Sequence, residues 1–194
     1  IVALGVGIAV ASPAQVASHI WPSSSVSAKL DGVAERARHL FENSQRALVA
    51  NFSGALLARG QLVRGPADFL IDLLAEPDLA VEILDRILEF NLTLVEAFLK
   101  RVGNYIQVIK ISDDIGAQNN LLISPAVYRK MIKPRQARFI STIHSLTAAK
   151  VLYHTDGAVA SLVDDFIEIG VDILNPIQVT AKGMDTAHLG ERYA

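Results

Sequence analysis

The sequence contains no cysteine among its 194 residues. This absence excludes a disulfide scaffold, a CxxC redox centre, a thiol nucleophile and a cysteine-ligated metal within these residues, and it agrees with the cytoplasmic location that we expect. An excess of one charge is also missing, because 18 basic side chains stand against 20 acidic ones. Such a balance gives no electrostatic footprint for nucleic acid or for an anionic membrane surface, so we expect neither as a partner.

The apolar run with which the sequence opens is too short to cross a membrane. Residues 1–11 (IVALGVGIAVA) are apolar, but a spanning helix needs about 20 such residues. No clear cleavage context of a signal peptide follows them. We interpret the run as a buried strand or the start of a packed helix, leave residues 1–22 without an assignment, and expect a soluble chain.

Short apolar runs alternate with segments of helical periodicity along the rest of the chain. The runs that predict strands are residues 47–52, 105–111, 150–153 and 171–174. The segments that predict helices are residues 31–41, 68–74, 78–102, 124–145, 158–169 and 185–192. Strands that alternate with helices indicate βαβ units and a parallel sheet. Strands that are nearly all apolar are typical of such a buried sheet.

Each predicted strand ends in polar residues. They are Asn51 and Ser53, Asp113 and Asp114, His154 and Asp156, and Asn175 and Gln178. In a (β/α)8 barrel the carboxyl ends of the strands converge on one mouth, whereas a doubly wound sheet gathers ligands only near its switch point. A full barrel takes about 250 residues. We therefore predict an α/β fold, an incomplete TIM (β/α)8 barrel of about four to five βα units, as a single domain over residues 1–194.

Three ordered motifs carry a family resemblance. They are Ser112–Pro125 (SDDIGAQNNLLISP), Tyr153–Gly157 (YHTDG) and Ile167–Gln178 (IEIGVDILNPIQ), and Gly183-Met184-Asp185 follows them. Over residues 31–194 the sequence resembles the uroporphyrinogen decarboxylase superfamily, which implies a TIM barrel. The superfamily has two chemistries: decarboxylation of uroporphyrinogen without a cofactor, and methyl transfer to or from a corrinoid protein, usually with zinc. The three motifs look closer to the methyltransferase-like and demethylase-like branch.

The resemblance implies a catalytic domain and leaves its reaction open. The first expectation is corrinoid-dependent methyl transfer or demethylation of a small methylated substrate, with the corrinoid carried by a partner protein above the barrel mouth. The alternative is uroporphyrinogen III decarboxylase of tetrapyrrole biosynthesis, a carboxy-lyase that acts on a porphyrinogen without a cofactor. A third possibility is a non-catalytic binding or assembly module, a truncated barrel that completes itself as a homodimer through its exposed sheet edges.

His154 and Asp156 are two residues apart at a predicted strand end, so both side chains can point to the same side. The resemblance implies a His-x-Cys zinc pattern here in the methyltransferase branch, and Asp156 takes the place of the cysteine. Zinc accepts imidazole and carboxylate ligands, so both residues are candidate metal ligands. In the decarboxylase branch the matching histidine contacts substrate. The structural alternative is a helix-capping aspartate beside a histidine bonded to the backbone.

Asp113 and Asp114 are adjacent, so only one of them is expected to reach the mouth. Such a carboxyl can act as a general acid that protonates a leaving oxygen or nitrogen, with burial raising its pKa, or it can orient the catalytic candidate His154. A helix or loop cap is the alternative for this pair. The predicted substrate-binding residues are amides, which can also serve only loops and turns; they are Gln118, Asn119, Asn175 and Gln178.

Overall fold

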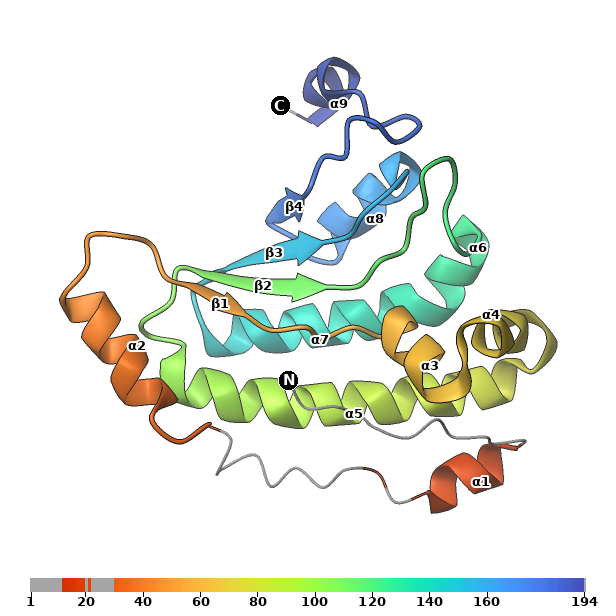
Figure 1. Cartoon of the computed structure of the whole chain (residues 1–194), viewed down its shortest axis with the longest axis horizontal. Coiled ribbons are helices and arrows are strands. Elements are labelled where there is room, and N and C mark those ends of the chain that lie inside the picture. The colour runs from red at the N-terminus through yellow and green to blue at the C-terminus, as the bar shows by residue number, and fades with distance from the viewer. Residues whose placement is uncertain (1–11, 20, 22–29, 194) are drawn as a thin grey trace.

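A four-stranded parallel sheet lies at the centre of the fold, with its strands in sequence order (Figure 1). The strands are β1 (Val49–Asn51), β2 (Val108–Ser112), β3 (Lys150–His154) and β4 (Ile173–Asn175). Each strand pairs with the next one along the chain, as Ile109 does with Val151. Consecutive parallel strands joined by helical connections are the arrangement of a barrel segment. The predicted α/β incomplete barrel is therefore confirmed.

The computed structural model describes residues 12–19, 21 and 30–193. The apolar run at residues 1–11, for which we predicted a strand or helix start, lies outside the described residues. The helices are α1 (Pro13–Ser18), α2 (Val33–Glu42), α3 (Leu57–Arg64), α4 (Pro66–Ala75), α5 (Pro77–Val102), α6 (Pro125–Val127), α7 (Lys133–Leu146), α8 (Val163–Glu168) and α9 (Thr186–Tyr193). None of these described helices combines the length and the apolarity that a membrane span requires.

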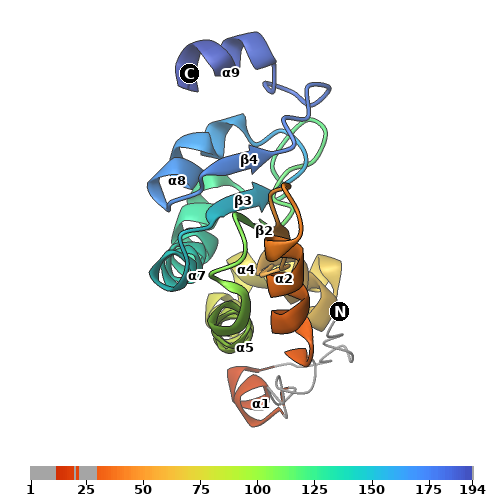
Figure 2. The same ribbon diagram turned by 90° about the vertical axis from the view of Figure 1, so that its left-hand side faces the viewer.

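The two faces of the sheet have different environments. Figure 2 shows α5, α7 and α8 following one another along one face. On that face the side chains of β2 and β3 are buried, among them Ile109, Ile111 and Tyr153. Because side chains alternate along a strand, Lys110 and His154 lie on the opposite face, where they are only partly buried. In a closed barrel this second face is the interior, and we call it the open face.

The helix predicted from Ser124 onward is interrupted near its start. The Ser124 hydroxyl accepts a hydrogen bond from the Val127 N–H and so caps α6, but residues 128–132 form a π-helical turn before α7 begins. Pro134 lies just after this turn. A proline offers no N–H and its ring clashes with the carbonyl four residues earlier, so the wider turn accommodates it without ending the helix.

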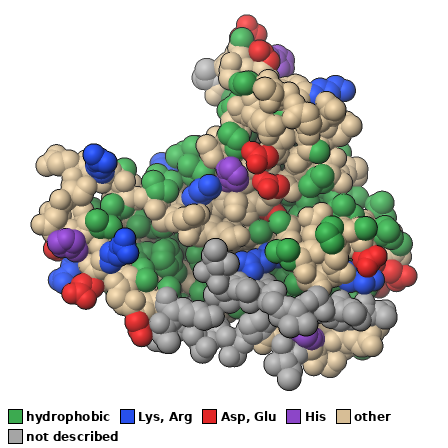
Figure 3. All heavy atoms as spheres, in the orientation of Figure 1, with side chains coloured by type: hydrophobic (Ala, Val, Ile, Leu, Met, Phe, Trp, Pro, Cys, Tyr) green, Lys and Arg blue, Asp and Glu red, His purple; other side chains and the backbone are tan. Residues whose placement is uncertain are grey.

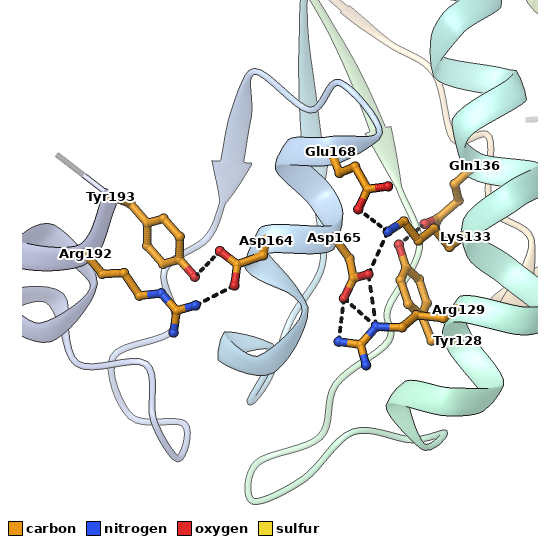
Figure 4. Close-up of polar contacts among 9 residues, drawn as sticks. All are labelled: Tyr128, Arg129, Lys133, Gln136, Asp164, Asp165, Glu168, Arg192 and Tyr193. Atoms are coloured by element: carbon orange, nitrogen blue, oxygen red, sulfur yellow. Dashed lines mark hydrogen bonds and ion pairs between the residues drawn. The ribbon is translucent and has the colours of Figure 1, made fainter.

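A group of paired charges joins the outer helices. Arg129 donates to the Asp165 carboxylate from Nε, at 3.1 Å to each oxygen, and from Nη2 at 2.9 Å, and Lys133 donates to the same carboxylate at 2.8 Å (Figure 4). Lys133 also pairs with Glu168 at 2.6 Å. We call these four residues the outer ion cluster. It fastens α8 to the π-helical turn and to the start of α7, on the side of the sheet away from the open face.

Candidate functional site

The loops after β2 and β3 bring three potential ligands together. One donor atom each of Asp114, His154 and Asp156 lies within 4.8 Å of the other two. His154 Nε2 is 3.9 Å from Asp156 Oδ2, and the backbone N–H of Asp156 donates to Asp114 Oδ1 at 3.2 Å. In Figure 3 a histidine lies beside acidic side chains over the carboxyl ends of these strands. We call this trio the carboxylate–histidine cluster.

The orientation of the His154 ring is set from the neighbouring strand. His154 ends β3 and is in register with Asn175 at the end of β4, and its Nδ1 is 2.9 Å from the Asn175 side-chain oxygen. An amide oxygen only accepts, so Nδ1 is the donor of this hydrogen bond. Nε2 is then the nitrogen that can offer a lone pair to a metal ion, and it faces Asp156. Metal-bound histidines commonly donate a hydrogen bond from their other ring nitrogen in this way.

Two glycines allow the loops to approach closely. A Cβ on Gly116 would lie 2.5 Å from the carbonyl oxygen of Asp156, and a Cβ on Gly157 would lie 2.5 Å from the carbonyl carbon of Gly116. Gly157 also has φ +92°, a conformation that other residues rarely adopt. The backbones of the two loops are therefore in contact close to Asp114 and Asp156.

The two adjacent aspartates have different roles in the structure. Asp113 is 3% exposed and accepts hydrogen bonds from the backbone N–H groups of Leu56, Leu57 and Ala58 at 2.8–2.9 Å, which caps α3. Burial raises the pKa of Asp113 to about 6, and the three N–H donors oppose this rise. Asp113 thus makes the capping contacts that we gave as the alternative for this pair, and Asp114 is the one of the two that lies in the carboxylate–histidine cluster. A catalytic role of Asp113 stays a prediction.

The predicted amides are distributed over two places. Gln178 accepts from the Gly157 N–H at 2.8 Å and donates to the Gln118 side chain at 3.1 Å, and Gln118 donates to the Thr180 carbonyl. These two amides tie together the loops after β2, β3 and β4. Asn119 instead lines a groove of about 540 Å³ with Lys182 and other residues of these loops. That these amides and Asn175 bind substrate stays a prediction.

Sequence reasoning missed two features of this region. Asp114 was considered as a proton donor, not as a third ligand beside His154 and Asp156. The sequence showed only that Asp114 follows a predicted strand, and the register that places Ser112 beside His154 is seen only in the structure. The second feature is Lys110, a charged residue between the apolar residues Ile109 and Ile111 of β2.

The donor set of the cluster fits a divalent metal ion. Zinc is bound by imidazole nitrogen and carboxylate oxygen, and catalytic zinc sites keep three protein ligands and one open position. Within the described part of the chain, neither Asp114 nor Asp156 forms an ion pair with a lysine or arginine. A cation between the two carboxylates would supply the missing positive charge.

Comparison with known proteins gives the family and the fold. The uroporphyrinogen decarboxylase (URO-D) profile matches residues 3–180, which confirms the resemblance. Among solved structures, a methyltransferase from Methanosarcina mazei superimposes with a TM-score of 0.59 at 20% sequence identity, over 73% of this chain and 40% of that one. The chain thus spans about two fifths of that protein's length, and the likeness is one of fold. Among curated proteins, none matches the sequence.

Proposed function

Because the chain belongs to the uroporphyrinogen decarboxylase family, we propose that it carries the site of a metal-dependent methyl transfer between a small methylated substrate and a corrinoid held by a partner protein. The observation that carries this proposal is the convergence of Asp114, His154 and Asp156. Decarboxylation in this family needs no metal, so a ready set of three ligands favours the methyl-transfer branch. The fold likeness to a methyltransferase agrees with this choice.

The residues of the cluster divide the work of holding an ion. His154 offers Nε2, while Asn175 fixes the ring through Nδ1. Asp114 and Asp156 supply two negative charges, and with neutral His154 they balance a divalent ion. A bound zinc ion would supply Lewis acidity toward the heteroatom that bears the methyl group. Zinc is the first expectation because the chemistry needs no redox change at the ion.

The exposure of the cluster suits transfer to a second protein. The side chain of Asp156 is 53% exposed and that of His154 is 28% exposed. His154 lies at the end of β3 on the open face, so a molecule bound on that face can reach the cluster. A substrate bound on the open face and a corrinoid presented at the carboxyl ends of the strands would meet at the cluster.

Zinc binding and methyl transfer test the proposal together. We expect the chain to bind one zinc ion per molecule by calorimetry and elemental analysis, and to form methylcobalamin from cob(I)alamin in the presence of a methylated donor. His154→Ala, Asp156→Asn and Asp114→Asn should each weaken zinc binding. Asp78→Asn, which removes an exposed carboxylate in the first turn of α5, is the matched control. Zinc affinity that is unchanged in all three cluster variants would contradict the proposal. Decarboxylation of a porphyrinogen by the metal-free chain would favour the alternative.

A further inference from the structure

Lys110 places a positive charge on the open face of the sheet. Its neighbours Ile109 and Ile111 are buried against the helices, so alternation turns the lysine to the other side. Lys110 is only partly buried there. Its backbone carbonyl accepts from the Phe52 N–H, but its ammonium forms no hydrogen bond or ion pair with any other residue that the structure describes. A cation inside a short central strand, with no acidic partner, has no evident structural purpose.

The register places Lys110 next to the carboxylate–histidine cluster. Lys110 pairs with Asn51 on one side and Leu152 on the other, and two residues further along β2, Ser112 pairs with His154. His154 is therefore offset from Lys110 by about 7 Å along the strands and by one strand spacing of about 4.8 Å, a separation that the flexible four-carbon stem of a lysine can bridge. Figure 3 shows a basic side chain beside a histidine on this face.

With a divalent ion bound, the other charges at the mouth do not compensate the positive charge of Lys110. Asp114 and Asp156 together balance a divalent ion. The buried Asp113 interacts electrostatically with Arg59 on α3. Lys110 then adds one positive charge to a neutral arrangement, and the exposed amide of Asn51 lies beside it in register. An ammonium with a neighbouring amide suits a carboxylate, since both can donate hydrogen bonds to its oxygens.

We infer, building on the proposed function, that the methyl donor carries a carboxylate and that Lys110 binds it while the methyl-bearing atom lies at the carboxylate–histidine cluster. Lys110 is then the residue that selects anionic over neutral donors. The Asn51 side chain assists it from the adjacent strand. A donor without a negative charge would leave the ammonium unpaired and would bind less tightly.

A matched pair of probes tests the inference. Methoxyacetate carries a methyl ether and a carboxylate, and 2-methoxyacetamide is its neutral counterpart. We would measure the affinity of both by ligand-detected NMR on the zinc-saturated chain. The carboxylate should bind about tenfold more tightly than the amide, the usual size of a charge-assisted hydrogen bond. Lys110→Gln should abolish this preference and Lys110→Arg should keep it. Lys130→Gln, which removes an exposed charge from the π-helical turn, should also keep it.

The outcomes separate this inference from the proposed function. Equal affinities of the two probes for the wild type, no measurable binding of the carboxylate, or an unchanged preference in Lys110→Gln overturns the role of Lys110. The melting temperature of each variant shows whether it is folded. If the wild type does not bind one zinc ion per molecule, the metal site is overturned instead. A Lys110-dependent preference measured without zinc would support the anion site independently of the metal site.

Discussion

The outer ion cluster and the carboxylate–histidine cluster are both built around aspartates, yet their charges are arranged in opposite ways. Asp165 is 5% exposed and receives hydrogen bonds from both Arg129 and Lys133. Asp114 and Asp156 are exposed, and within the described residues they lie beside a histidine without a lysine or arginine partner. Folding alone satisfies the first group. The second group is left open to a cation from solution, and that difference separates a structural ion cluster from a candidate binding site.

The largest effect should follow from His154→Ala. Removing a metal ligand should weaken zinc binding by more than the roughly 10–100-fold that is typical when only the hydrogen-bond partner of a ligand is removed. Because His154 is part-exposed and unbonded to any cation, the melting temperature of the metal-free chain should change little. Calorimetric titration with zinc and thermal unfolding without it check the two halves. A large fall in the melting temperature of the metal-free variant would show that His154, like the outer ion cluster, stabilises the fold.

Asp165→Asn should have the converse effect. It breaks charge-assisted hydrogen bonds to a buried acceptor, so we expect it to lower the free energy of unfolding by about 2–3 kcal/mol. Zinc affinity should stay within twofold of the wild type, because the substitution lies on the far side of the sheet. Denaturant unfolding and the same zinc titration measure these changes. A marked loss of zinc binding would show that the two clusters are coupled.

The contribution of Asp165 should also depend on pH. The hydrogen bond from Arg129 lowers the pKa of Asp165 below its ordinary value. Its ion pairs therefore contribute stability that is complete above the unfolded-state pKa of about 3.9 and is lost as the pH falls through the lowered value. The stability difference between wild type and Asp165→Asn should be constant near neutral pH and shrink below about pH 4. A difference that grows on acidification would contradict this assignment.

Asn175→Ala should reduce zinc affinity about tenfold, which is smaller than the loss of a ligand. The substitution frees the His154 ring, so its Nε2 is no longer held toward the carboxylates. Zinc titration of Asn175→Ala beside His154→Ala measures the difference. Equal losses in the two variants would mean that Asn175 does more than orient the ring.

The smallest effect should come from Asp164→Asn. Asp164 neighbours Asp165 in sequence, but it is exposed and bonds to Arg192 and Tyr193 of α9 (Figure 4). Exposed ion pairs contribute about 0–1 kcal/mol, so the free energy of unfolding should fall by less than in Asp165→Asn. A similar loss in both variants would show that burial does not explain the strength of the outer ion cluster.

The sequence predicted the sheet well because its signals are local. Four apolar runs and the helical patterns between them place every strand of the described chain, and polar residues mark the carboxyl ends. Helix α3 was missed for a tertiary reason. Its sequence contains Gly60, which lies against the ring of Phe69, and its amino end is capped by Asp113 from a distant loop. The third ligand was missed likewise, since only the pairing of β2 with β3 brings Asp114 to His154.

The hydrogen bonds of Gln118 and Gln178 have a mechanical consequence. These two side chains join the loops after β2, β3 and β4 by hydrogen bonds. Because the backbones at Gly116 and Gly157 are also in contact, we expect the three loops to move together and not singly. The loops beside the carboxylate–histidine cluster thus form a wall that is in place before a reactant arrives.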